Sequence, residues 1–180
     1  MRSNARFFAA VLVCGAQVTC AGSLLAGRLT PSHLSMPMAT LGSLSATPGT
    51  ITFQATNPDL GAVSGSAPGN ITWIVLGGSQ TQNWTVTVQA GANSFAGCPT
   101  VPISAVRVTC ASATVSGSGG NGGCNGSFPL STTPQQIAGG TQGDGANSYS
   151  VSLNFTLAES WRYVANSSCT LTLTYFVSAP

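Results

Sequence analysis

Few side chains in this chain could transfer a proton or attack a substrate. Its 180 residues include no lysine and one histidine, His33, and the acids are Asp59, Asp144 and Glu159. Enzymes draw mainly on His, Asp, Glu, Lys and Cys for acid–base and nucleophilic catalysis. No Gly-x-Ser-x-Gly elbow accompanies the many serines, so nothing supports a Ser-His-Asp set. The sequence therefore indicates a protein that is not an enzyme and needs no cofactor.

Metal-binding residues are equally scarce. Asp144 stands alone in Gly143-Asp144-Gly145, whereas calcium requires six to eight oxygen ligands. The cysteines do not follow Cys-x-x-Cys spacing, and His33 is remote from them in sequence. We therefore interpret Asp144 as a turn residue and expect no metal site.

The first 21 residues have the pattern of a cleaved signal peptide. Arg2 and Arg6 provide the positive charge, Phe7 to Ala16 form a short apolar run, and Thr19 and Ala21 place small residues at a cleavage site. The apolar run is too short to span a bilayer, which needs about 20 residues. Alternatives are a buried N-terminal helix, or lipid attachment at Cys20. We expect a secreted or cell-surface protein without a transmembrane segment.

Four cysteines remain after that cleavage, and an even number in an exported chain predicts two disulfide bonds. They are Cys98, Cys110, Cys124 and Cys169. Three connectivities are possible, and we favour Cys98–Cys110 and Cys124–Cys169. The first would close a short loop across a hairpin. The second would tie a glycine-rich loop to the last strand.

Charge is nearly absent from the exported part of the chain. Charged residues make up only 4% of the sequence, and after cleavage three acids balance Arg28, Arg107 and Arg162. A protein without a basic patch lacks the electrostatic footprint for nucleic acid or anionic lipid. A neutral surface also repels its own copies only weakly, which permits self-association.

Alternating apolar and polar residues predict β-strands throughout the chain after the signal. The pattern is clearest over residues 150–157 and 170–177, and it recurs at Thr50–Ala55, Ile71–Leu76, Trp84–Ala90 and Ala105–Val115. Shorter strands are expected near 41–46 and 128–131. Turn residues separate the strands, and no segment has a helical period with caps. We predict an all-β fold, a single antiparallel β-sandwich of the immunoglobulin-like kind.

The domain prediction places the sandwich at residues 49–180, after an N-terminal arm or first edge strand at 22–48. Within the sandwich, Ile71–Leu76 and Trp84–Ala90 are expected to pair as a hairpin joined by residues 77–83. Ser168–Ser178 is long and uncharged, so it lacks the usual protection against pairing at a sheet edge. Either the protein covers that edge or another chain pairs with it.

Aromatic residues are the best candidates for ligand contacts. Trp73 and Trp84 are either core residues or an exposed platform for sugar rings. Trp161, Arg162 and Tyr163 could clamp a ligand by stacking and a bidentate contact. The alternative for this second group is a structural pair of Glu159 and Arg162 beneath Trp161.

The segments Thr50–Phe53, Trp73–Val75, Gln82–Val88 and Thr172–Tyr175 together resemble a WxL domain, as does the terminus Ser178-Ala179-Pro180. WxL domains are exported, β-rich modules of bacterial surfaces that are associated with cell-wall peptidoglycan. The resemblance implies a WxL-like sandwich and a wall glycan as partner. This chain departs from the family in having valine where both Trp-x-Leu motifs have leucine, and in its two expected disulfides.

Two functions follow from these observations. The first is a secreted or cell-surface structural or adhesive protein that is not catalytic and associates with copies of itself. In that case, segment 23–48 could supply a strand to a neighbouring copy. The alternative is a carbohydrate- or cell-wall-binding module that uses the tryptophans and Tyr163.

Overall fold

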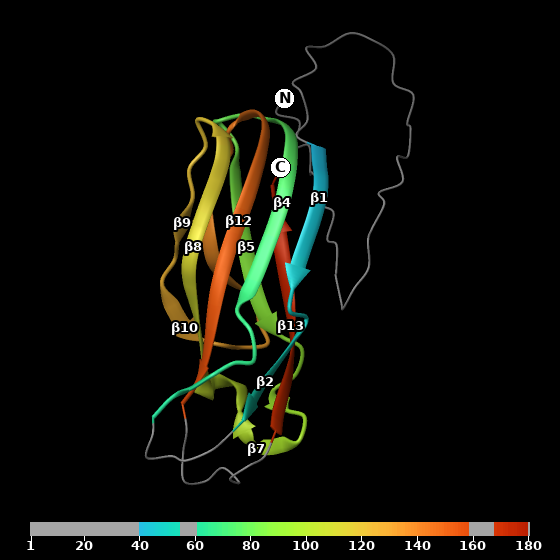
Figure 1. The fold of residues 1–180 in the computed structure, drawn as a ribbon, viewed down its shortest axis with the longest axis vertical. Coiled ribbons are helices and arrows are strands. Elements are labelled where there is room, and N and C mark those ends of the chain that lie inside the picture. Colours follow the sequence, from blue (N-terminus) through green and yellow to red (C-terminus); the bar gives the residue numbers. More distant parts are fainter. Residues whose placement is uncertain (1–39, 55–60, 159–167, 180) are drawn as a thin grey trace, which may run out of the picture.

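The structure is a computed structural model that describes residues 40–54, 61–158 and 168–179. It is all-β with antiparallel pairing, arranged as an elongated, sandwich-like pair of sheets (Figure 1), which confirms the prediction of an all-β, antiparallel fold. The predicted signal, His33, Asp59 and the segment from Glu159 to Tyr163 lie outside the described residues.

Sheet one has the strand order β1-β4-β12-β8-β10, and β3 pairs with β12. Its strands are β1 (Thr40–Thr47), β3 (Val63–Ser64), β4 (Gly69–Gly78), β8 (Val106–Ser118), β10 (Ser127–Pro129) and β12 (Asp144–Leu157).

Sheet two has the order β2-β13-β5-β11-β9. Its strands are β2 (Thr50–Gln54), β5 (Asn83–Ala90), β9 (Gly123–Cys124), β11 (Gln135–Thr141) and β13 (Ser168–Ser178). A small separate sheet of β6 (Ser94–Phe95) and β7 (Cys98–Pro102) precedes the short 3₁₀ turn η2 (Ile103–Ala105).

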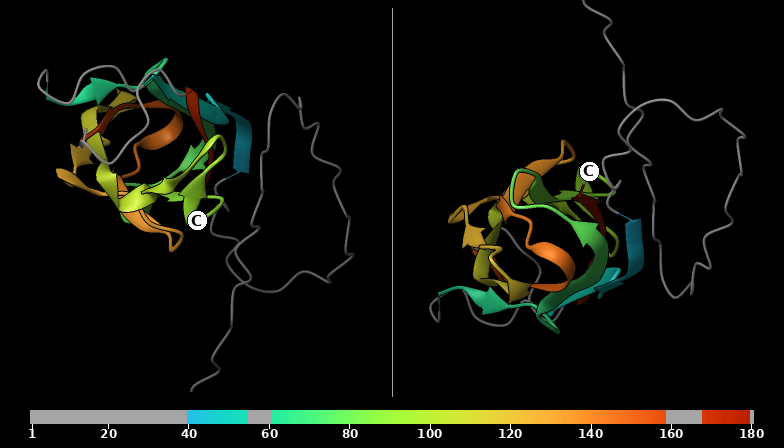
Figure 2. Two further views of the ribbon diagram at one scale, coloured as in Figure 1. Left: turned by 90° about the horizontal axis from the view of Figure 1, so that it is seen from below. Right: turned by 90° about the horizontal axis from the view of Figure 1, so that it is seen from above.

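The core lies between the two sheets, whose strands surround a common interior when seen along the long axis (Figure 2). Alternate residues of β4 and β12 are buried, as an antiparallel sheet with one wet face requires. At the centre, the rings of Trp73 and Tyr149 from sheet one stack with centroids 5.0 Å apart. Trp84 from sheet two meets them edge-on at 5.3 and 5.8 Å. Three aromatic rings thus join the sheets.

The predicted hairpin of Ile71–Leu76 with Trp84–Ala90 is wrong. β4 pairs with β1 and β12 in sheet one, whereas β5 pairs with β13 and β11 in sheet two. The turn between them, closed by a hydrogen bond from Gln82 N to Ser79 O, carries the chain from one sheet to the other. Alternation predicts which face of a strand is buried but does not identify the strand's neighbour.

β13 lies between β2 and β5 in the strand order of sheet two, so strands of the protein itself pair with it, which was the first of the two alternatives. It pairs with β2 over Ser168–Thr172 and with β5 over Leu173–Ser178. The described part of segment 22–48 instead forms β1, which is the edge strand of sheet one beside β4.

The prediction of two disulfides is confirmed, but the favoured pairing is wrong. The bonds are Cys98–Cys169 and Cys110–Cys124, with Cα atoms 5.2 and 5.4 Å apart. Cys98 and Cys110 do not share a hairpin, because β7 pairs with β6 and β8 pairs with β12. In the chain-entropy model, bonds that close loops of these lengths stabilise the fold by about 4 and about 3 kcal/mol.

The glycine-rich segment 117–126 crosses from β8 to β9 and closes one long side of the molecule. Hydrogen bonds from Asn121 N to Thr141 O and from Asn125 N to Ile137 O hold it against β11. A Cβ on Gly140 would overlap the carbonyl oxygen of Asn121. Gly117 has a φ of 139° and faces the side chain of Asn147. Glycine is therefore required here by close backbone packing.

We expect Gly140→Ala to lower the free energy of unfolding by about 2 kcal/mol, because its methyl group would overlap backbone that cannot move freely. Gly123→Ala on the paired strand β9 is the matched control. Its nearest contact would be Gly139 O at 3.9 Å, so a change within about 1 kcal/mol is expected. Guanidinium unfolding with intact disulfides measures both, and equal midpoints would contradict this packing.

Candidate functional site

The outward side chains of four neighbouring strands in sheet one line up in three rows, which we call the hydroxyl face. Each row runs across β1, β4, β12 and β8 in register. The rows are Ser43, Ile74, Ser148 and Ser116; Ser45, Thr72, Ser150 and Thr114; and Thr47, Asn70, Ser152 and Ser112. Every position except Ile74 carries a hydroxyl or an amide.

The regularity of the hydroxyl face follows from strand geometry. Neighbouring strands lie about 4.8 Å apart, and residues two apart in one strand share a face. Because Trp73 and Val75 on β4, and Tyr149 and Val151 on β12, point into the core, the residues between them must point outward. The aromatic core therefore determines which side chains face solvent.

A shallow depression of about 330 Å³ lies on the hydroxyl face. Its side-chain lining comes from Ser43, Thr72, Ile74, Thr114, Ser116, Ser148 and Ser150. Thr114 Oγ1 donates a hydrogen bond to Ser150 O at 3.4 Å. The other hydroxyls of this lining make no hydrogen bond within the part of the chain that the structure describes, so they are available to a partner or to water.

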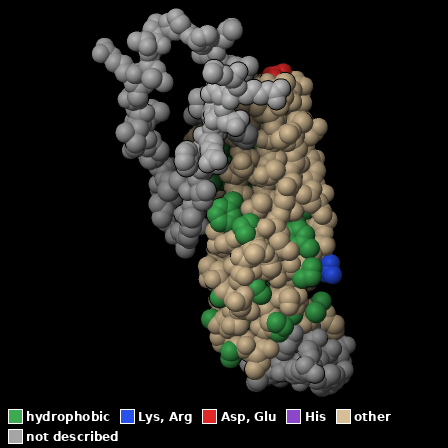
Figure 3. All heavy atoms as spheres, turned by 180° about the vertical axis from the view of Figure 1, so that it is seen from behind, with side chains coloured by type: hydrophobic (Ala, Val, Ile, Leu, Met, Phe, Trp, Pro, Cys, Tyr) green, Lys and Arg blue, Asp and Glu red, His purple; other side chains and the backbone are tan. Residues whose placement is uncertain are grey.

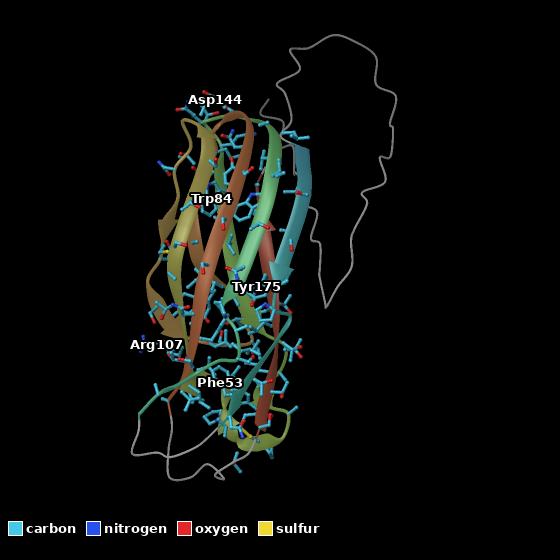
Figure 4. All side chains as sticks on the ribbon, viewed as in Figure 1. Phe53, Trp84, Arg107, Asp144 and Tyr175 are labelled. Atoms are coloured by element: carbon cyan, nitrogen blue, oxygen red, sulfur yellow. A yellow bond between two sulfur atoms is a disulfide. The ribbon has the colours of Figure 1, made fainter. Side chains whose placement is uncertain are left out.

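The hydroxyl face carries no charge. Arg107 and Asp144 are the charged residues of ranges 40–54, 61–158 and 168–179, and neither belongs to the three rows. Asp144 lies at one end of the molecule, where its carboxylate accepts hydrogen bonds from Gln80 N and Nε2 at 3.1 and 2.6 Å (Figure 4). Arg107 lies toward the other end and contacts Ser127 (Figure 4). Where the described residues are visible from the opposite side, charge appears only at the top and at one edge (Figure 3).

Three large apolar side chains are exposed at one corner of sheet one, which we call the apolar corner. Leu41, Ile74 and Leu76 are 42%, 38% and 47% exposed. Ile74 and Leu76 point outward from β4, whereas Leu41 pairs with the buried Val75 and therefore lies at the opposite face of the same corner. A β-bulge lies between Leu41 and Ser43. Gly42 lies within this bulge. A side chain at position 42 would contact Leu76, and glycine leaves that space open.

β1, next to the apolar corner, has an outer edge with no strand partner within the described residues. The edge strand of sheet two is protected differently. Ser66 N donates to Thr52 O on β2 at 2.9 Å, and Thr52 N donates to Ser66 Oγ at 3.2 Å. The far side of sheet one leads through β10 and the Cys110–Cys124 bond into sheet two. Within the described residues, β1 thus offers an eight-residue strand with one edge available for pairing.

Trp73 and Trp84 are 1% and 0% exposed, so neither can stack on a sugar. This corrects the ligand-binding interpretation of these two residues, because each occupies an inward position of its strand. Trp84 Nε1 donates to Asn121 O and Thr141 O at 3.0 and 3.1 Å, whereas the buried Trp73 Nε1 has no hydrogen-bond partner among the described residues. The other predicted ligand residues, Trp161, Arg162 and Tyr163, lie outside the described residues.

The titratable groups form no reactive constellation in the described ranges. No group of three or more His, Cys, Asp and Glu residues lies close enough there to hold a metal. Burial raises the pKa of the Tyr175 phenol above its ordinary value, so the hydroxyl stays protonated and donates to Pro48 O at 3.1 Å. This bond ties sheet two to the residue that follows β1.

The described residues contain no helix long and apolar enough to cross a membrane.

The apolar corner was not among the residues singled out from the sequence. The signal was present in the alternation of Thr72, Ile74 and Leu76 with Trp73 and Val75. Once the indole is assigned to the core, Ile74 and Leu76 must face solvent. Their proximity to the free edge could not be inferred, because it depends on the pairing of β1 with β4.

No protein-family model, curated protein or solved structure matches this chain.

We expect Trp84→Phe to destabilise the protein more than Trp73→Phe, by about 1–2 kcal/mol. Both changes remove similar apolar volume from the same cluster. Only the first removes a donor shared by two carbonyl oxygens, whereas the second deletes an N–H that has no partner in the part of the chain that the structure describes. Chemical unfolding monitored by far-ultraviolet circular dichroism measures the difference. Equal losses would show that these hydrogen bonds do not anchor the glycine-rich segment.

Proposed function

We propose that this is an exported structural or adhesive protein that works by presenting neutral β-sheet surfaces and associates with copies of itself. The observation that carries the proposal is the free edge of β1 next to the apolar corner. Natural sheets usually protect such an edge with charge, proline or a covering segment. β1 has the sequence Thr-Leu-Gly-Ser-Leu-Ser-Ala-Thr, which contains neither charge nor proline.

Export is supported by the two disulfides. Disulfides persist mainly in oxidising compartments, and here they join β7 to β13 and β8 to β9. An N-terminal signal peptide over residues 1–21 and display at a cell surface belong to the same proposal. The WxL resemblance is also part of this proposal. The two Trp-x-Val triplets would correspond to the two motifs of that family, and their indoles, Trp73 and Trp84, join the two sheets.

We expect the protein from residue 22 onward to self-associate as its concentration rises. Light scattering after size exclusion, from about 10 µM to 1 mM, should show the mean mass increasing above that of the monomer. Because apolar and backbone contacts would hold the copies together, 1 M salt should not weaken the association. A monomer at every concentration would contradict the proposal.

A second candidate function, binding of a neutral polysaccharide, is favoured by the depression on the hydroxyl face. Its hydroxyls, which have no partner among the described residues apart from that of Thr114, match the hydrogen-bonding groups of a sugar chain, and Ile74 adds an apolar contact to the lining. Peptidoglycan is the wall polymer that the WxL resemblance implies.

Sedimentation with insoluble peptidoglycan, cellulose and chitin tests this second function. We expect retention that falls at least fivefold in Thr72→Val/Ser150→Ala. Thr87→Val on sheet two is the control and should be retained like the wild type. If only Trp161→Ala or Tyr163→Ala reduces retention, the site lies on those residues. Absence of retention on all three polymers would exclude the function.

A further inference from the structure

β1 is a strand that can pair with a copy of itself. Beyond the bulge, residues 43–47 form a regular stretch paired with β4. In an antiparallel pair of identical strands, opposed residues point to the same face, so Ser45 can lie opposite Ser45 of the second copy. Leu44 would then face Ala46 on the inner side, and Ser43 would face Thr47 on the outer side. Every residue meets one of matching polarity.

We propose that β1 pairs with β1 of a second copy, antiparallel about a two-fold axis at Ser45, so that sheet one continues through two molecules. This inference rests on the proposed self-association and assigns it a surface. A two-fold contact uses the same patch on both partners, which is the commonest arrangement among soluble oligomers.

The inner face of β1 supports this pairing. Leu44 and Ala46 are only partly buried and pack against the edge of the core. A second β1 alongside would cover the sides of these residues that now face outward. The same contact would satisfy the backbone N–H and C=O groups of the outer edge, which form no ladder within the described residues.

Charge also favours a second copy as the partner. β1 and β4 contain no charged residue, and Arg107 and Asp144 belong to β8 and β12. Two identical charges placed opposite each other across strands destabilise a pair. Here no such repulsion arises when the strand meets itself. The hydroxyl rows would continue across the contact, because Ser43, Ser45 and Thr47 would lie beside Thr47, Ser45 and Ser43 of the second copy.

The size of the contact determines its strength. Five paired residues per copy bury less than about 1,200 Å² in total, which is the range of transient interfaces. Leu41, just beyond the bulge on β1, adds apolar area at each end of the contact. We therefore expect a dissociation constant between about 10 µM and 1 mM, so that the pair would form mainly where copies are concentrated.

A charge-swap experiment tests the two-fold pairing. Ser45 is exposed on the outer face, so Ser45→Lys and Ser45→Glu should fold like the wild type by circular dichroism. Each variant alone should associate at least tenfold more weakly, because like charges would meet at the axis. An equimolar mixture should recover association at low salt and lose it again in 1 M salt. Analytical ultracentrifugation measures all of these.

Ser112→Lys and Ser112→Glu are the matched controls, because Ser112 lies on the same face but on β8. They should associate like the wild type, alone or mixed. If the wild type associates and the Ser45 variants do so equally well, the β1 surface is wrong while self-association stands. If both Ser45 variants weaken association and their mixture does not restore it, the two-fold register is wrong. A wild type that stays monomeric at 1 mM overturns both proposals.

Discussion

The contact among Trp73, Trp84 and Tyr149 is the interaction on which the rest of the structure depends. Two of these rings come from neighbouring strands of sheet one and the third comes from sheet two. Large aromatic side chains contribute more buried area than any other residue type. Fixing three rings at ring-to-ring distance sets the spacing of the sheets and the inward face of β4, β5 and β12. The outward faces follow from the same alternation.

Much of this arrangement could be inferred from the sequence, because period-two alternation reports burial directly. Leu153 and Phe155 on β12, and Leu171 and Leu173 on β13, are buried as their spacing indicates. The strand partners could not be inferred in this way. Trp73 and Trp84 are separated by a short turn, which suggests neighbouring strands, yet they face each other from opposite sheets. A turn that closes a hairpin and one that crosses between sheets differ little in composition.

Cysteine pairing shows the same limit. The even number of cysteines indicated two bonds, but their partners depend on the topology of the sheets. Cys169 meets Cys98 because β7 passes beside the start of β13, and Cys110 meets Cys124 because the glycine-rich segment returns across the edge of β8. The hydroxyl face is likewise invisible in the linear sequence. Its rows combine residues from β1, β4, β8 and β12, and only the register brings these together.

The position of the Cys98–Cys169 bond has a mechanical consequence. β13 is the last strand described, and its final residues lie at the upper end of the molecule (Figure 1). Tension applied there would peel β13 from β5 and then from β2 one hydrogen bond after another. Peeling would stop at Cys169, because that residue is covalently held to β7. Under load the protein would thus lengthen by one strand, and the force would then pass through the disulfide bond to Cys98 and β7.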